Sequence, residues 1–280
     1  MTSRERMMAV LRGEIPDRVP CAPDISNMIP CRLTGKPFWD IYLYQDPPLW
    51  KAYIDAVKHF GFDGFLGPVF SLDEGKRHEP RWTEAIVQRT ENRIVTQDFR
   101  EDEWGEREWL PRIRIYDRDQ PRTFKDPSLL GLPNVPPEWE PVEGVREWPE
   151  GEELLKLVRR EMGEQGIVAG RAGRTIIVGT PEAIYEYHEN PEKYRRLRDE
   201  ILERAEADLA KIMAMETKPD YISMGGSGTL IWQTPAMFRE LGLPILKRMS
   251  ALCRKAGMPS TVHSCGPEKE LVRIADCRRH

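Results

Sequence analysis

Apolar residues along this chain follow two alternating patterns, one typical of helices and one typical of buried strands. Apolar positions three and four residues apart predict long helices over 49–60, 151–165, 191–216 and 235–255. Short apolar runs predict strands over 19–25, 64–70, 166–170, 219–224 and 258–263. Thr2 and Glu5 have the spacing of a capping box, which predicts a short helix ending at Gly13. Strands that alternate with helices predict a parallel sheet.

The pattern changes between residues 82 and 149. Polar and apolar residues alternate from 82 to 117, with Glu91-Asn92 between two strand-like runs, so we expect an antiparallel hairpin and a further strand at 112–116. The stretch 117–149 is rich in proline and predicts a long irregular loop. Four tryptophans of this insertion could stack on a flat macrocycle, although packing of the loop is their more common use: Trp104, Trp109, Trp139 and Trp148.

The order of elements indicates a single α/β domain over 1–280. No G-x-G-x-x-G follows the first predicted strand, so a (β/α)8 TIM barrel is favoured over a doubly wound sheet. About five parallel strands are predicted where a closed barrel has eight, so the expected barrel is incomplete. The apolar pattern stops after Ala275, which predicts that the chain is truncated.

Composition narrows the class of protein. The chain has 280 residues, 40% hydrophobic and 31% charged, with a formal net charge of -4. That charge does not favour nucleic-acid binding, and no apolar run reaches the ~20 residues that cross a bilayer. No secretory signal pattern opens the sequence, so the cytoplasm is the expected location. Five scattered cysteines predict reduced thiols rather than a disulfide framework.

The tripeptide His263-Ser264-Cys265 carries the clearest candidate chemistry. Residues two apart in a strand point to the same face, so the imidazole and the thiolate could bind one zinc ion. The alternative is a histidine packed at a strand end beside a buried cysteine. A catalytic zinc usually has three protein ligands. Cys277 and His280 follow a predicted helix that would carry them away from the pair, so the third ligand is missing.

Several strings resemble one enzyme superfamily. SRERMMAVLRGEIPDRVP at 3–20 is similar to the N-terminal signature of the uroporphyrinogen decarboxylase (URO-D) superfamily. The segments PDYIS, TPAMFRELGLPILKR and GMPSTVHSCG resemble the same superfamily in order and spacing, at 219–223, 234–248 and 257–266. This resemblance implies a TIM barrel.

The superfamily has two branches with different chemistry. The resemblance to the methylcobamide:thiol methyltransferases rests on H-x-C-G and implies that His263 and Cys265 bind zinc. A zinc-bound thiolate would then attack the methyl group of a corrinoid carried by a partner protein. The alternative is uroporphyrinogen decarboxylase, an enzyme of porphyrin biosynthesis that acts on a tetrapyrrole, but its R-Q-A-G-R motif is absent after the first predicted strand. A third possibility is a non-catalytic remnant of the fold.

Other residues are candidates for binding a small-molecule substrate. Arg171 and Arg174 lie on a glycine-containing turn after a predicted strand, where two guanidiniums could bind carboxylates or phosphates, or else form a solvated turn. Ser227 stands in a glycine-rich loop, at a place where the resemblance implies an acidic segment in many members of the superfamily. Because this chain has no carboxylate there, a substrate contact is favoured over proton transfer. Asp24 and Asn27 follow the first predicted strand and either contact the substrate or cap the loop.

Overall fold

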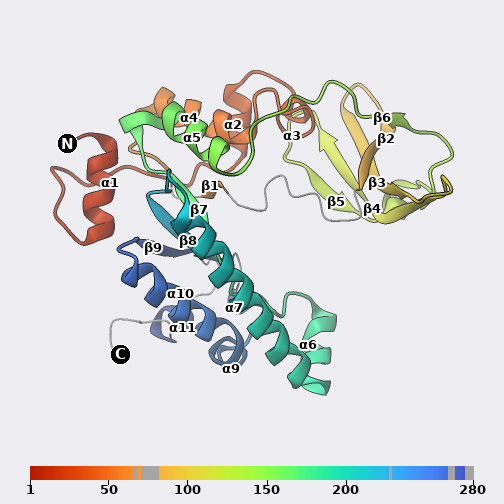
Figure 1. The fold of residues 1–280 in the computed structure, drawn as a ribbon. Helices are drawn as coiled ribbons and strands as arrows, with labels where there is room; N and C mark the ends of the chain where they lie inside the picture. Colours follow the sequence, from red (N-terminus) through yellow and green to blue (C-terminus); the bar gives the residue numbers. More distant parts are fainter. Residues whose placement is uncertain (66–67, 71–81, 227–228, 264–268, 275–280) are drawn as a thin grey trace. The chain divides into compact units, whose positions relative to one another are not determined.

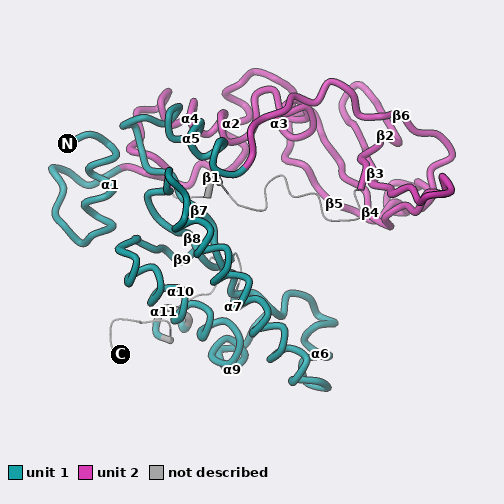
Figure 2. The backbone as a smooth tube through the Cα atoms, viewed as in Figure 1, with its two compact units in different colours: residues 1–20, 66–74, 151–280 teal, residues 21–65, 75–150 magenta. Residues whose placement is uncertain are grey.

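A computed structural model describes residues 1–65, 68–70, 82–226, 229–263 and 269–274 of the chain. The chain divides into two compact units (Figure 2). Unit 1 comprises Met1–Pro20, Leu66–Glu74 and Gly151–His280, and unit 2 comprises Cys21–Phe65 and Gly75–Glu150. The predicted insertion over 82–149 therefore belongs to unit 2, together with the helical segment 28–60 that precedes it. None of the described helices is long and apolar enough to span a membrane.

Unit 1 contains the parallel part of the structure (Figure 1). Its strands are β1 (Pro68–Phe70), β7 (Ala169–Arg171), β8 (Tyr221–Gly225) and β9 (Ser260–His263). Its longer helices are α1 (Ser3–Arg12), α5 (Gly151–Met162), α6 (Pro181–Glu189), α7 (Pro191–Ala214) and α10 (Leu243–Lys255). Its short helical segments are η2 (Gly163–Gln165), α8 (Thr229–Trp232), α9 (Pro235–Met237), the π-helical η3 (Phe238–Gly242) and α11 (Lys269–Ile274).

The prediction of a TIM barrel is wrong for the part of the chain that the structure describes. The four parallel strands form an open sheet in the order β1-β7-β8-β9, and the remaining strands form a separate antiparallel sheet. The predicted strand over 19–25 is irregular, and Val19 is exposed. Pro20 and Pro23 explain this difference, because a proline has no N–H group to donate to a sheet ladder. The other four predicted parallel strands are present, with shifted ends.

The amino edge of this sheet is held by a buried carboxylate. Asp220 accepts hydrogen bonds from the backbone N–H of Val168 at 2.8 Å and from Arg4 Nη2 at 2.6 Å, and it pairs with Arg159 Nη1 at 3.0 Å. Its side chain is only 3% exposed, so these partners replace the water that the charge has lost. Asp220 thereby links α1 and α5 to the start of β8.

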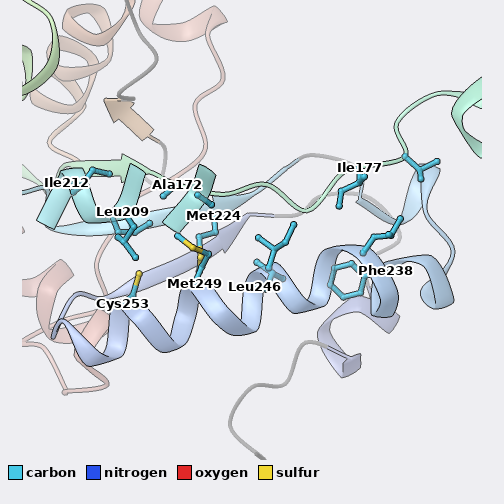
Figure 3. Packing of buried hydrophobic residues seen from close by; sticks show 14 of the residues in the cluster. Ala172, Ile177, Leu209, Ile212, Met224, Phe238, Leu246, Met249 and Cys253 are labelled. Carbon is cyan, nitrogen blue, oxygen red and sulfur yellow. The ribbon is translucent and has the colours of Figure 1, made fainter. Parts of the chain in front are cut away.

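One face of the sheet is covered by helices. Ile222 and Met224 of β8 belong to a buried apolar cluster to which α7 and α10 both contribute (Figure 3). Further members of that cluster, all labelled in the figure, are Leu209, Ile212, Phe238, Leu246, Met249 and Cys253. The helices α7 and α10 connect β7 to β8 and β8 to β9, and sequential parallel strands place such connections on the same side of a sheet.

Unit 2 is built around a five-stranded antiparallel sheet in the order β5-β4-β3-β2-β6. The strands are β2 (Thr83–Arg89), β3 (Arg93–Glu101), β4 (Arg107–Asp117), β5 (Thr123–Lys125) and β6 (Glu140–Pro141), with the 3-10 turn η1 (Pro127–Leu130). The helices are α2 (Met28–Leu33), α3 (Phe38–Tyr42) and α4 (Leu49–Phe60). The predicted hairpin is confirmed, since β2 and β3 pair antiparallel with Arg89 opposite Ile94.

The two faces of the antiparallel sheet bury different groups. Ile86, Ile94 and Tyr116 pack with α2 and α3 on one face, whereas Val95 and Ile113 pack beneath the η1 segment on the other. A polar network lies beside the first group: Arg114 binds both oxygens of Asp98 at 2.6 Å, and Glu84 accepts hydrogen bonds from Thr96 and Tyr116. Because these polar side chains satisfy one another, the network stabilises the register of the strands.

Candidate functional site

The candidate site is the carboxyl edge of the parallel sheet in unit 1. Strand register pairs Arg171 of β7 with Ser223 of β8, Ser223 with Thr261 of β9, and Gly225 with His263. Successive side chains of a strand point to opposite faces, and Ile222 and Met224 point toward the helices. The paired positions therefore form a polar row on the opposite face. Ligands of open parallel sheets bind at the carboxyl ends of the strands, so this row occupies the edge where a site is expected.

The position of Gly225 at the end of β8 leaves no room for a side chain. A Cβ atom on Gly225 would lie 2.5 Å from the carbonyl oxygen of His263, a separation that real Cβ atoms do not adopt. Gly225 also has a φ of +93°, which only glycine adopts without strain. The ends of β8 and β9 can therefore pair only with a glycine at this position.

The backbone of the loop after β7 is hydrogen-bonded to a buried side-chain amide. Gln233, which follows α8, is 1% exposed, and its Oε1 accepts hydrogen bonds from the backbone N–H groups of Ile177 and Val178 at 3.0 and 3.3 Å. Its Nε2 donates to the carbonyl oxygen of Thr175 at 2.9 Å. The Thr175 hydroxyl lies 3.0 Å from that of Thr229. These bonds satisfy backbone groups that have no ladder partner, so the loop that carries Arg174 has a defined path.

The arginines at the two edges of the sheet differ in their partners. Arg4 and Arg159 bind the buried Asp220 at the amino edge. Arg171 and Arg174 are exposed, and within the described residues neither has an ion pair or a hydrogen bond. A guanidinium always carries its charge in proteins and binds planar anions through two parallel N–H groups. The carboxyl edge thus presents two guanidiniums that have no partner in the described part of the chain.

The predicted metal pair is only half described. His263 is exposed and ends β9, which agrees with a position at the end of a strand, whereas Cys265 lies outside the described residues. No three histidine, cysteine, aspartate or glutamate side chains in the described part of the chain are grouped so that they could hold a metal ion. One nitrogen and one sulfur donor do not complete a zinc site. The described part of the chain therefore supplies one of the two predicted zinc ligands, the His263 imidazole.

The predicted substrate residues divide between the units. Arg171 and Arg174 lie in unit 1, and Ser227 falls outside the described residues. Asp24 and Asn27 belong to unit 2. The structure thus brings the two arginines and His263 to one sheet edge, whereas Asp24 and Asn27 lie in the other unit.

Asp24 and Asn27 have local structural partners. Asp24 Oδ1 accepts a hydrogen bond from the backbone N–H of Ser26 at 2.9 Å, and Asn27 Oδ1 accepts one from the Tyr53 hydroxyl at 2.7 Å. Burial, with a contribution from the nearby Asp24 charge, raises the pKa of Tyr53 to about 12, so the hydroxyl remains a donor at neutral pH. The Asp24 contact agrees with the capping alternative, whereas the Asn27 side chain makes no capping hydrogen bond at the start of α2.

The tryptophans of the insertion mostly pack against other rings. Trp109 and Trp139 lie 4.8 and 5.1 Å from the ring of Phe99. Trp148 meets Trp50 edge-on at 5.4 Å. Trp104 differs, because it is 80% exposed. Packing of the loop therefore accounts for three of the four tryptophans.

Sequence reasoning missed three parts of the site: the hydroxyl row of Ser223 and Thr261, the Gly225 contact, and the Gln233 amide. Alternation within PDYIS could have placed Ser223 on the face of Tyr221, opposite the apolar Ile222. Gln233 has no local signal, because its role depends on a loop more than fifty residues earlier in the chain.

Comparison with protein-family models, with curated proteins and with solved structures finds no match to this chain.

Proposed function

We propose that this chain is a member of the uroporphyrinogen decarboxylase superfamily and that unit 1 binds a carboxylate-bearing small molecule at the carboxyl edge of its parallel sheet. The observation that supports the proposal is the difference between the two sheet edges. Arginines at the amino edge have a protein carboxylate as partner, whereas Arg171 and Arg174 have none in the described part of the chain. A ligand carboxylate would supply the missing partner.

Each part of the edge would have a distinct task. Arg171, at the end of β7, would bind one carboxylate of the ligand. Arg174 would bind a second carboxylate, and it lies on the loop whose backbone is hydrogen-bonded to Gln233. The row of Ser223 and Thr261 offers hydroxyl groups on the same face, which can orient polar groups of the ligand. The close pairing of β8 and β9 at Gly225 would keep His263 in register with this row. These residues bind and orient a ligand, and they leave the reacting group unassigned.

The experiment is a titration of the purified chain with uroporphyrin, a stable carboxylate-rich tetrapyrrole, followed by the change in porphyrin absorbance. We expect Arg171→Gln to weaken binding about tenfold, because one charge-assisted pair is lost. Arg160→Gln is the matched control, since Arg160 is also an exposed arginine of unit 1 but lies on α5. Equal losses in both variants, or no binding by the unmodified chain, would contradict the proposal. Release of CO2 from uroporphyrinogen would assign the reaction to the decarboxylase class.

A second candidate function is zinc-dependent methyl transfer to a thiol. It is supported by the exposure of His263 at the end of β9, two residues before Cys265. When bound, zinc would supply a thiolate nucleophile at neutral pH, and a corrinoid on a partner protein would supply the methyl group. Metal analysis of the purified chain tests it, with Co2+ absorption as a readout of thiolate ligation. We expect His263→Ala and Cys265→Ala to abolish both signals, and an unmodified chain without bound metal would exclude this function.

A further inference from the structure

Unit 2 contains a pocket of about 810 Å³ that the proposed function does not use. It lies between the segment that joins α2 to α3 and the ends of strands β3 and β4. Its volume falls in the range of roughly 300–1,000 Å³ that is typical of small-molecule sites. The charged residues of its lining are Arg32, Lys36, Arg93, Asp117, Arg118 and Asp119.

Positive charge dominates the lining. Four of the side chains that line the pocket are cationic and two are carboxylates. Arg93 is neutralised within the lining, because its Nε donates to Asp117 at 2.7 Å. Lys36 pairs at 2.7 Å with Asp46, which does not line the pocket. The charges left to consider are therefore those of Arg32, Arg118 and Asp119.

Arg32 and Arg118 are the two guanidiniums available to a ligand. Arg32 is exposed on α2, and within the described residues it has no ion pair or hydrogen bond. Arg118 has no carboxylate partner there either; its guanidinium lies 5.9 Å from the ring centre of Trp39 and donates one long bond, of 3.5 Å, to the carbonyl oxygen of Glu91. Asp119 likewise has no cationic partner among the described residues, and its charge opposes the binding of an anion.

The two walls of the pocket are joined by backbone hydrogen bonds. The N–H of Phe38, at the start of α3, donates to the carbonyl oxygen of Arg118 at 2.8 Å. The N–H of Arg118 donates to the carbonyl oxygen of Asn92 at 3.0 Å. Both walls belong to unit 2, so the position of Arg118 relative to α3 is defined before any ligand arrives. The backbone of the site is therefore ordered before binding, and only the guanidinium side chains remain to be ordered by the ligand.

We propose that this pocket binds a phosphorylated small molecule. A guanidinium presents paired N–H donors that match the oxygens of a phosphate, and two guanidiniums from separate segments can bind one dianionic group from two sides. A phosphate also concentrates more than one negative charge in a single group, and its attraction to the two guanidiniums exceeds its repulsion from the single carboxylate of Asp119. The pocket has room for a body beyond the phosphate, with Pro37 as its apolar contact.

Isothermal titration of the full chain with inorganic pyrophosphate tests this proposal, with citrate as the carboxylate comparison. We expect pyrophosphate to bind, and Arg32→Gln and Arg118→Gln each to weaken binding about tenfold. Asp119→Asn should strengthen binding, because it removes the opposing charge. Arg32 has no partner to lose in the described chain, so its variant should melt at the same temperature as the unmodified chain.

Two further variants locate the bound anion. Arg112→Gln removes an equal charge from unit 2 outside the pocket, where the guanidinium lies 4.9 Å from the ring of Phe124, and it should leave binding unchanged. Arg171→Gln should also leave it unchanged, which separates this pocket from the sheet edge of unit 1. The proposal is overturned by an absence of binding, by equal weakening in Arg112→Gln, or by weakening confined to Arg171→Gln. Binding of citrate without pyrophosphate would overturn the phosphate assignment.

Discussion

Gln233 Nε2 donates a hydrogen bond of 2.9 Å to the backbone carbonyl of Thr175, and both residues are 1% exposed. The Oε1 atom of the same side chain accepts hydrogen bonds from two backbone N–H groups of the loop that follows β7. One amide therefore satisfies three backbone groups of a segment without regular structure. This relationship fixes the path of the loop on which Arg174 lies.

Replacing Gln233 with methionine should lower the free energy of unfolding by about 3 kcal/mol or more, because three buried backbone groups would lose their partner at roughly 1–3 kcal/mol each. Urea unfolding followed by circular dichroism measures the change. Gln165→Met is the control, since Gln165 is exposed on the η2 turn and should tolerate the change within about 0.5 kcal/mol. Similar stabilities for the two variants would show that the amide contributes little.

Gly225→Ala should destabilise unit 1 more than Gly257→Ala, although both glycines have a positive φ. Gly257 also has a positive φ, of +67°, but open space surrounds the position of its Cβ. Alanine there should cost about 1–2 kcal/mol for the left-handed conformation alone. At Gly225 the same cost is joined by the contact with the His263 carbonyl, so strand β9 must shift. Thermal melting of both variants makes the comparison, and an equal loss would mean that the contact relaxes freely.

The ion pair of Arg6 and Asp17 should make stability depend on acid pH. Arg6 Nε and Nη2 donate to the two Asp17 oxygens at 2.6 and 2.9 Å, and these bonds hold the pKa of Asp17 well below its ordinary value of 3.8. Because the pKa of Asp17 is lower in the folded protein than in the unfolded chain, the ionised carboxylate stabilises the fold at pH values above the unfolded-state pKa. This stabilisation is lost as the pH falls toward the folded-state pKa. The Asp17→Asn variant should therefore melt below the unmodified chain at pH 7.

That difference in melting temperature should shrink as the pH falls below about 4, where the unfolded aspartate becomes protonated. Melting temperatures at a series of pH values, measured on both proteins, make the test. Glu203→Gln is the control, because Glu203 is exposed and has no ion pair in the described chain, so it should show no such convergence. A difference for Asp17→Asn that stays constant with pH would contradict the assignment.

Thiol labelling should distinguish the described cysteines. Burial raises the pKa of both Cys31 and Cys253 to about 11, whereas Cys21 is exposed. At pH 8 a thiol with that pKa is thiolate in only about one molecule in a thousand, and the thiolate is the reactive form. Iodoacetamide should therefore modify Cys21 at least about tenfold faster, as peptide mass spectrometry would show. In urea the three should react at similar rates, and rapid labelling of Cys253 in the folded chain would contradict the packing of α10.

Local sequence signals predicted the elements whose stability is local. The capping box of Thr2 and Glu5 is present with both of its hydrogen bonds, and α1 ends at Gly13 in the left-handed conformation. The β2–β3 hairpin follows the alternation that predicted it. The strand expected over 19–25 is irregular because its prolines interrupt the ladder, although its apolar residues match a strand pattern. Apolar spacing alone does not report which backbone groups can pair.

The sequence by itself determined that strands and helices alternate in unit 1 and that His263 ends one of those strands, whereas Arg171, expected on the turn after a strand, is the last residue of β7. Only the tertiary structure decided that four parallel strands form an open sheet rather than a barrel, and that Asp24 and Asn27 belong to another unit. The reason is that helix and strand periodicity arises from neighbours in the chain. Sheet closure, the Gly225 contact and the Gln233 amide depend instead on groups distant in sequence, whose pairing no local pattern records.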